Sequence, residues 1–378
     1  MERRRLGDIA TYINGYPFKP EDRGTEGLPI IRIQDLTGNA YDLGFYNGSY
    51  PKRIEINDGD VLISWSASLG VYIWNRGKAL LNQHIFKVVF DKAPVNKEYF
   101  VYAVQHKLKE METKTHGATM KHIVKKDFDN TEIPFPTMER QAEIAGILSK
   151  VATVIEDRRA QLSALDDLIK ARFVELFGSY PTNEKGWETG TIRNLVTEVR
   201  YGSSRKAADG DSGKYPYLRM NNITYGGELD LSDTKTIDIP DEELDKCTVR
   251  RGDLLFNRTN SKELVGKTCV YDRDEMMVLA GFVVRVRLND KALPEFVSAF
   301  MNTDFSKKML LGMCKAAIGQ ANINAQELQN IGIYIPPIRT QRDFVSFKEQ
   351  IDKSKFAVQK SLEETQKLFD SLMQQYFG

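Results

Sequence analysis

The second half of the chain repeats the pattern of the first half at an offset of 200 residues. The anchors are two Pro-bearing segments, residues 133–141 and 333–341. From there the register holds without a gap to residues 176–178 and 376–378. Each copy therefore has the same order of a globular stretch, a short strand and a long helix. A two-unit repeat with helical tails predicts a pseudo-two-fold molecule, which suits a two-part target such as duplex DNA.

The composition is that of an ordinary globular protein. A length of 378 residues, with 41% hydrophobic and 28% charged residues, predicts two or three domains with real cores. We expect a cytoplasmic protein, since no apolar run reaches the roughly 20 residues of a membrane span and no apolar signal region follows the basic start. The three cysteines indicate reduced thiols. A net charge of +1 means that a DNA binder must gather its basic side chains on one face or rely on a partner for phosphate contacts.

Residues 138–177 and 338–377 show unbroken three-and-four spacing of apolar side chains. This predicts two helices of about 40 residues, each about 60 Å long. Because each helix trails its own lobe, a pseudo-two-fold would pair them antiparallel; surface helices on a core are the alternative. Polar residues interrupt the seams at non-equivalent positions, which would help to fix the register. The predicted seam comprises Ile144, Leu148, Val151, Ile155, Leu162, Leu165, Ile169 and Leu176, and Phe344, Ile351, Val358, Leu362, Phe369 and Leu372.

The two lobes contain matched segments that predict a mixed α+β fold. Apolar, strand-like runs recur in the same order, and Gly-Asp turns precede the second run of each lobe. Apolar residues at three and four spacing predict a helix in each lobe, and a Pro, Asn and Gly-rich stretch predicts a linker. The matched runs are 28–37 with 215–224, 58–64 with 251–257 and 85–90 with 283–288, the helices are 96–111 and 294–312, and the linker is 179–186.

No catalytic machinery is evident in the sequence. Residues 265–268 (Val-Gly-Lys-Thr) resemble the tail of a phosphate-binding loop, but Ser261 stands where that motif needs glycine, so a turn is the better interpretation. The four histidines lack metal-ligand spacing, and no Ser or Cys lies in a nucleophile turn. We therefore predict no catalytic, cofactor-binding or metal-binding residues in this chain.

Polar loops at equivalent points of the two lobes are the candidate binding elements. Side chains with varied donor and acceptor patterns are what reading of base edges requires. For any single residue a structural role in a turn is the alternative, and for Arg219, as for Arg32, that role would be a salt bridge. The DNA-binding candidates are Ser64, Trp65, Ser66, Ser68, Gln83, His84, Thr119, Lys121 and His122 in the first lobe, and Arg219, Asn221, Asn257, Arg258, Thr259, Asn260, Ser261, Lys262, Gln320, Asn322 and Asn324 in the second.

With these features, the chain resembles the specificity subunit of type I restriction-modification systems over essentially its whole length. The resemblance is carried by the Gly-Asp strands at 59–64 and 252–257 and by the Arg-containing strand before each. The Gly-containing loops near Gly117 and Gly319 and the helix entries at 136–141 and 336–341 follow in the same order, twice.

The resemblance implies two target recognition domains, at residues 1–136 and 181–336, that each read one half of a bipartite DNA site. It implies two spacer helices, at 137–180 and 337–378, that pair as an antiparallel coiled coil and dock two methylation subunits. Those subunits would carry S-adenosylmethionine and flip the target adenine, and the translocating restriction subunits would join them. The chain itself would be a non-catalytic subunit of a restriction and adenine-methyltransferase complex, without a cofactor of its own.

Two other functions remain open from the residues. One is the recognition subunit of a related restriction system in which a single partner chain both cleaves and methylates. The other is a two-lobed protein-binding scaffold, which the near-neutral charge permits.

Overall fold

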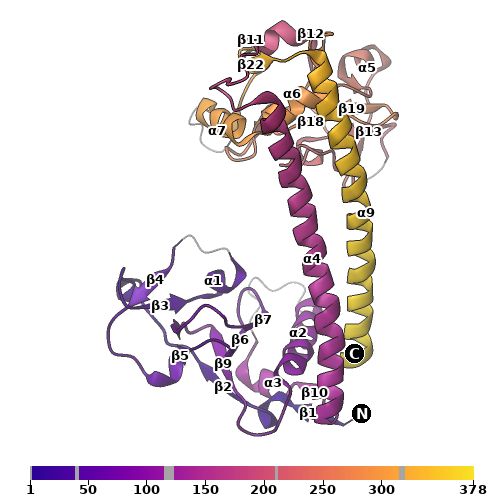
Figure 1. Ribbon diagram of the computed structural model, residues 1–378. Coiled ribbons are helices and arrows are strands. Elements are labelled where there is room, and N and C mark those ends of the chain that lie inside the picture. Colours follow the sequence, from indigo (N-terminus) through magenta and orange to yellow (C-terminus); the bar gives the residue numbers. More distant parts are fainter. Residues whose placement is uncertain (1, 39–41, 115–122, 209–211, 315–319) are drawn as a thin grey trace. The chain divides into compact units, whose positions relative to one another are not determined.

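The computed structural model describes residues 2–38, 42–114, 123–208, 212–314 and 320–378 (Figure 1). The chain divides into two compact units. The first unit comprises Met1–Ala160 together with Gln359–Gly378, and the second comprises Gln161–Val358. Each unit therefore contains one lobe and a part of both long helices. No helix among the described residues is long and apolar enough to cross a membrane.

The first lobe is built on two four-stranded sheets. The first sheet is antiparallel, in the order β2 (Thr11–Asn14), β9 (Ile85–Val89), β6 (Val61–Ser64) and β7 (Gly70–Ile73). The second has the order β4 (Gly44–Tyr46), β3 (Leu28–Ile31), β8 (Ala79–Leu81) and β5 (Glu55–Ile56), with β3 and β8 parallel. The other elements are the pair β1 (Arg3–Arg5) and β10 (Glu132–Pro134), and the helices α1 (Ile33–Thr37), α2 (Lys97–Lys114) and α3 (Lys125–Asp129).

The second lobe repeats this plan. Its first sheet has the order β12 (Val196–Tyr201), β20 (Val283–Leu288), β16 (Leu254–Asn257) and β18 (Thr268–Val270). Its second has the order β14 (Lys235–Ile237), β13 (Tyr215–Leu218), β19 (Met277–Leu279) and β15 (Thr248–Val249), with β13 and β19 parallel. The other elements are the pairs β11 (Glu188–Thr191) with β22 (Gly332–Ile335) and β17 (Thr259–Asn260) with β21 (Ala321–Asn322), and the helices α5 (Asp241–Cys247), α6 (Pro294–Met301), α7 (Asp304–Met313) and α8 (Ala325–Gln329).

The predicted Gly-Asp turns precede the buried central strand of each first sheet. Gly59 (φ +87°) and Gly252 (φ +89°) adopt the left-handed conformation that glycine reaches without a steric cost. The following aspartates close the turns. Asp60 accepts a backbone N–H from three residues upstream at 2.8 Å, and Asp253 accepts one at 3.0 Å. The mixed α and β fold with two repeated lobes is thus confirmed.

Three predicted elements differ from the structure. The strands expected at 28–37 and 215–224 stop early, because a side chain turns the backbone into a helical turn. Asp35 accepts the backbone N–H of Arg32, and the Asn222 Oδ1 atom accepts that of Arg219, both at 2.8 Å. The helix expected at 294–312 is divided into α6 and α7, because Thr303 caps the start of α7 by accepting the Ser306 N–H at 3.2 Å.

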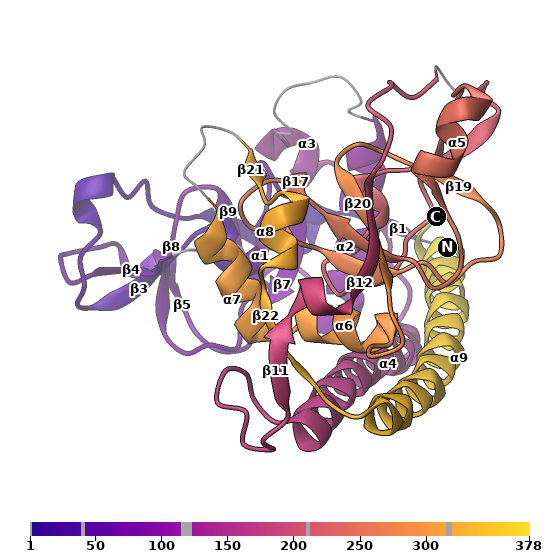
Figure 2. The same cartoon turned by 90° about the horizontal axis from the view of Figure 1, so that it is seen from above.

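The two long helices are α4 (Met138–Phe177) and α9 (Ile338–Phe377), each of 40 residues. They lie side by side in both views (Figure 1 and Figure 2). They pack antiparallel: in the first unit the Arg140 guanidinium lies 5.8 Å from the ring centroid of Tyr376. In the second unit the Lys355 ammonium lies 2.7 Å from the Asp166 carboxylate. All fourteen predicted seam residues are buried or half-buried.

Lys355, a polar residue within the seam of α9, forms an ion cluster. Its ammonium group contacts the Asp166 carboxylate of α4 at 2.7 Å and the Glu228 carboxylate, in a loop of the second lobe, at 2.5 Å. Burial alone would lower the pKa of Lys355, but the two carboxylates outweigh that effect and raise it. The equivalent position of the first helix is Ile155, which is buried. The cluster therefore ties α9 to α4 and to the lobe within the second unit only.

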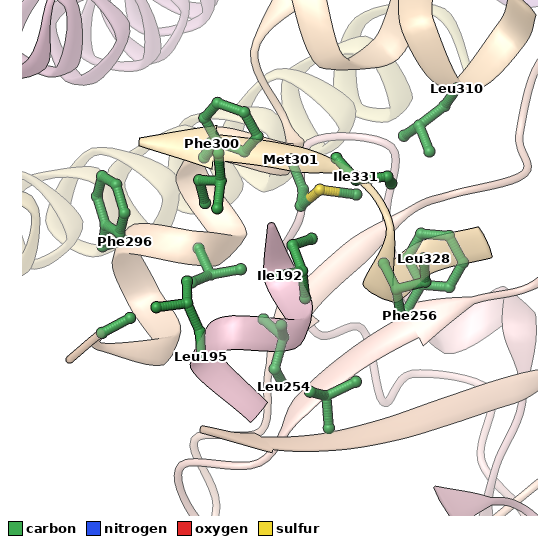
Figure 3. Close-up of a cluster of buried hydrophobic side chains, with 14 of the residues drawn as sticks. Ile192, Leu195, Leu254, Phe256, Phe296, Phe300, Met301, Leu310, Leu328 and Ile331 are labelled. Carbon is green, nitrogen blue, oxygen red and sulfur yellow. The ribbon is translucent and has the colours of Figure 1, made fainter. Parts of the chain in front are cut away.

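Each lobe buries the end of the helix that belongs to the other repeat. Phe177, the last residue of α4, is fully buried in the second lobe, with its ring 4.8 Å from that of Phe296 and 5.6 Å from that of Phe344. Phe377, the last residue of α9, is fully buried in the first lobe, 5.2 Å from the ring of Tyr99. Phe296 and its neighbours from α6, α8 and β16 form the core in Figure 3. The spacing of the helix seams did not predict this exchange.

A buried glutamine near the start of each long helix fixes the helix to its lobe. Both Gln141 and Gln341 are fully buried. The Gln141 Oε1 atom accepts the backbone N–H of Asn96 at 2.9 Å, and its Nε2 donates to the Pro136 carbonyl at 2.9 Å. Gln341 makes the same two kinds of bond, to the residues at 293 and 336, and a third to the carbonyl at 291. This explains why the glutamine recurs in the repeat.

Replacing Gln341 by leucine is expected to destabilise the second unit by on the order of 2–4 kcal/mol, because buried backbone groups lose their partners. Gln141→Leu should cost less, since Gln141 makes two such bonds and Gln341 three. Urea unfolding followed by hydrogen exchange in each unit measures both effects. The control is Gln359→Leu on the exposed face of α9, which should change stability by less than about 0.5 kcal/mol. Equal costs for all three variants would contradict this role.

Candidate nucleic-acid interface

Three segments meet where the central strand of each lobe ends, and we call this place the strand-end junction. In the first lobe, the backbone N–H of Trp65 donates to the His84 carbonyl at 3.4 Å, and the backbone carbonyl of Trp65 accepts the N–H of Ile123 at 3.0 Å. In the second lobe Arg258 takes the place of Trp65. Its N–H donates to the Phe282 carbonyl, and its carbonyl accepts the N–H of the residue at 323, both at 2.9 Å. The backbone at the junction is therefore the same in both lobes.

The side chains at the first junction form an aromatic group. The Trp65 indole Nε1 donates to the Asn14 Oδ1 atom at 3.2 Å. The Trp65 ring lies edge-on to His84, with centroids 5.3 Å apart, and stacks on Phe86 at 5.6 Å. His84 itself is exposed. Asn14 ends β2, the edge strand of the sheet, so two distant parts of the chain supply this surface.

The side chains at the second junction form a cationic group at the same positions. The Arg258 guanidinium lies 5.0 Å from the ring centroid of Tyr201, which ends β12 as Asn14 ends β2. Its Nη2 atom donates to the Asn322 Oδ1 atom at 3.2 Å. Tyr201 and Phe282 are 45% and 49% exposed, so the junction presents aromatic faces beside a positive charge. A shared frame thus carries two chemically different surfaces.

The structure brings together two of the predicted loops in the second lobe. β17 and β21 pair antiparallel, with Thr259 opposite Asn322 and Asn260 opposite the residue at 321. The Asn322 Nδ2 atom also donates to the Thr259 hydroxyl at 3.1 Å. Figure 2 shows the two strands side by side. Residues 257–262 and 320–324 therefore form one surface in place of two.

Several predicted DNA contacts are instead held within the protein. Ser64 is fully buried and donates to the Ser68 carbonyl at 2.6 Å. Asn257 is fully buried and donates to the carbonyls at 259 and 282, both at 3.1 Å. Asn324 caps α8, and Arg219 forms an ion pair with the Asp233 carboxylate at 2.8 Å. We therefore infer that these side chains stabilise the loops, which is the structural role named above as the alternative for any single residue.

The other candidates divide by exposure. Ser66 and Thr259 are buried, and Trp65, Arg258, Asn260 and Ser261 are half-buried at the junctions. Thr119, Lys121 and His122 lie outside the described residues. The exposed candidates are Ser68, Gln83 and His84 in the first lobe, and Asn221, Lys262, Gln320 and Asn322 in the second.

A glycine next to each junction escaped the sequence analysis. A Cβ atom on Gly15 would lie 2.1 Å from the Asn82 carbonyl oxygen, and one on Gly202 would lie 2.3 Å from the Ala280 carbonyl oxygen. Real Cβ atoms do not approach backbone so closely, so both positions need glycine for close packing of two backbones. In the sequence, each of these glycines directly follows the edge strand of its lobe, which could have indicated the close packing. The two glycines are not 200 residues apart, so the constant offset of the repeat did not align them.

Gly202→Ala is expected to push the loop at 280–282 away from β12, lowering stability by about 3 kcal/mol and weakening DNA binding by the second lobe. The matched control is Gly146→Ala within α4, where a Cβ atom would meet nothing within 4 Å. That change should stabilise the helix by about 0.5–1 kcal/mol. Thermal unfolding and duplex binding measured together test the pair. Unchanged binding by the Gly202 variant would show that the junction does not depend on this close approach.

The remaining motifs of the sequence have structural roles. Residues 265–268 run from the end of a turn into the start of β18, and the buried Lys267 ammonium donates to the Met220 carbonyl at 2.8 Å. The three cysteines are free and buried, and burial raises the pKa of Cys269 to about 12, so its thiol stays protonated. Within the described part of the chain, no group of His, Cys, Asp and Glu could hold a metal ion.

Comparison with known proteins gives matches over both halves. The family model for the type I restriction modification DNA specificity domain matches residues 1–164 and 184–366. Similar proteins include the type I restriction enzyme EcoBI specificity subunit of Escherichia coli, 23% identical over 92% of this chain and 78% of that protein. The MjaVIII specificity subunit of Methanocaldococcus jannaschii is 24% identical over 98% of this chain and 90% of that protein.

Two solved structures share the fold. The crystal structure of the S subunit of a type I restriction-modification system from M. genitalium superposes with a TM-score of 0.55 at 14% identity, covering 100% of this chain and 96% of that one. A chain from a study of complex assembly and conformational transition of the type I R-M system gives a TM-score of 0.57 at 16% identity, covering 99% and 97%. At such identities the likeness concerns the fold alone.

Proposed function

Because this chain belongs to the type I restriction modification DNA specificity family, whose model matches both halves, we propose that it selects the DNA sequence on which a type I restriction-modification complex acts. Each lobe reads one half of a bipartite site. The observation that carries the proposal is the pair of strand-end junctions. Their backbone hydrogen bonds are the same, while Trp65 in one lobe stands where Arg258 stands in the other. Two different half-sites require such an arrangement.

The long helices set the distance between the two readers. Two packed helices of 40 residues form a stiff element, and its length is fixed by the number of residues. Such an element suits a measuring role better than a flexible linker would. The gap between the two half-sites therefore follows from the helices, while the bases follow from the lobes.

The helices also provide equivalent docking positions for two methylation subunits. Leu168 of α4 and Leu368 of α9 stand at the same place in the repeat, and their side chains are 45% and 52% exposed. Exposed leucines repeated in this way suit two copies of one partner that each bury the same contact. The methylation subunits bring S-adenosylmethionine and the chemistry, and the restriction subunits complete the complex. The specificity chain positions DNA and catalyses no step.

Co-expression of this chain with its neighbouring genes, followed by genome-wide mapping of methylated adenines, tests the proposal. We expect a bipartite motif with two defined halves and a gap of constant length. A partner of a single polypeptide type that copurifies would instead indicate a system with a fused nuclease and methyltransferase. A complex that fails to shift duplex DNA even at low salt would support a protein-binding scaffold and contradict the proposal.

A further inference from the structure

The side chain of Arg258 is held in place from two sides. Its guanidinium lies 5.0 Å from the ring centroid of Tyr201, and its Nη2 donates to the Asn322 Oδ1 atom at 3.2 Å. Both supports are fixed themselves. The Tyr201 hydroxyl accepts the backbone N–H of Ala325 at 3.1 Å, and the Asn322 Nδ2 donates to the Thr259 hydroxyl at 3.1 Å. The planar group is therefore oriented before any ligand arrives.

Most of the hydrogen-bonding capacity of this guanidinium is unused. A guanidinium carries five N–H donors, and Asn322 takes one of them. The Nε atom of Arg258 is buried without a hydrogen-bond partner among the described residues, so it cannot serve an external ligand, and the donors left for one are on the two terminal nitrogens. Arg219 and Arg287 each pair with a carboxylate, at 2.8 Å in both cases, whereas no carboxylate in the described part of the chain pairs with Arg258. Arg258 thus retains its charge and a fork of donors for an external acceptor.

We propose that Arg258 reads a guanine in the half-site of the second lobe, through the O6 and N7 atoms at the major-groove edge. The inference rests on the proposed function and adds the base and the residue that reads it. Arginine binds this edge with two parallel hydrogen bonds, which no other base offers. A guanidinium already oriented by Tyr201 and Asn322 loses little freedom on binding. Tyr201 and Asn322 act as positioning residues.

The first lobe has no such reader at the same position. Trp65 replaces Arg258, and its only N–H donor on the side chain is bonded to Asn14 at 3.2 Å. It carries no charge and offers no fork to a guanine. The junction of the first lobe therefore imposes no guanine at the equivalent place in its half-site. This difference explains how one frame specifies two unlike half-sites.

The test uses the purified complex of this chain with its methylation subunits and duplexes in which each base pair of the mapped site is changed in turn. For the wild-type complex, replacing one particular G·C pair of the second half-site should lower the affinity for the duplex about tenfold to hundredfold. The Arg258→Ala complex should bind the original site correspondingly more weakly and become indifferent at that pair, while it still discriminates at every pair of the first half-site. Arg258→Lys keeps the charge without the planar fork, so its preference for this pair should be weaker than that of the wild type.

Three results would overturn the inference. The second half-site of the wild type could contain no guanine that matters, or the preference could survive in Arg258→Ala. A uniform loss at all sequences with a weaker salt dependence would assign Arg258 to a phosphate. Lys246→Ala, which removes an exposed cation of α5 in the same lobe, is the matched control and should leave the preference intact. A wild-type complex without any bipartite specificity would refute the proposed function itself, before a variant is compared.

Discussion

Replacing Phe377 by alanine is expected to destabilise the first lobe by about 3–5 kcal/mol, although the residue ends the second repeat. Phe377 is fully buried, with its ring 5.2 Å from that of Tyr99 and 6.1 Å from that of His106, so the change leaves a cavity in the core of the first lobe. Phe177→Ala should have the mirror effect and destabilise the second lobe, where Phe177 contacts Phe296. Hydrogen exchange followed separately in the two lobes measures both effects.

The control for this pair is Val174→Ala, one turn before Phe177 on α4. Val174 is 49% exposed, so its truncation should change neither lobe by more than about 0.5 kcal/mol. In each phenylalanine variant, hydrogen-exchange protection could instead be lost from the lobe of the same repeat, or equally from both lobes. Either result would show that the helix ends do not complete the core of the other repeat's lobe. The expected pattern would instead show that neither repeat can finish its own core.

Removing one heptad from each long helix is expected to shorten the gap in the methylated site by about three base pairs, since seven residues span about 10 Å and base pairs are spaced about 3.4 Å apart. The segments to delete are residues 152–158 of α4 and 361–367 of α9. They face each other in the antiparallel pair, because the contacts of Arg140 with Tyr376 and of Asp166 with Lys355 bracket the register and place residue 155 opposite residues 361 to 366. Whole heptads keep the apolar seam in register on both sides of the cut.

The adenine methylation map of cells carrying the shortened chain measures the result. Both half-sites should keep their bases, since the deletions leave the lobes unchanged. The control substitutes alanine at Leu368 alone, which keeps the helix length and should keep the gap while weakening association with the methylation subunits. Methylation of the unchanged site by the shortened chain would mean that the helices do not set the distance.

The long helices were predictable because their signal is local and periodic. Apolar side chains at three and four spacing placed both helices correctly, and the constant offset of 200 residues aligned them with each other. The burial of Phe177 and Phe377 could not be predicted in this way. Their partners Phe296 and Tyr99 belong to the other lobe in sequence, and periodicity within one helix carries no information about contacts between repeats.

The candidate interface could be proposed in outline from the sequence. Polar loops after the Gly-Asp strands were predicted as binding elements, and the structure joins two of the predicted loops through β17 and β21, while their contact with DNA stays a prediction. The loop sequences do not indicate which side chains stabilise the loop from within and which side chains face solvent. Asn257 and Arg258 are neighbours in sequence, yet the first is fully buried and the second lies on Tyr201, 57 residues earlier in the chain. Such choices depend on strand order, which no local pattern encodes.

The central claim is that one repeated frame holds two independent readers, and a single exchange of loop residues tests it. Residues 258–262 are replaced by the equivalent loop of a family member with a different known half-site, which spares the buried Asn257. The adenine methylation map is then compared with that of the original chain. We expect a changed second half-site, an unchanged first half-site and the same gap. A map in which both halves change, or neither does, would contradict the claim.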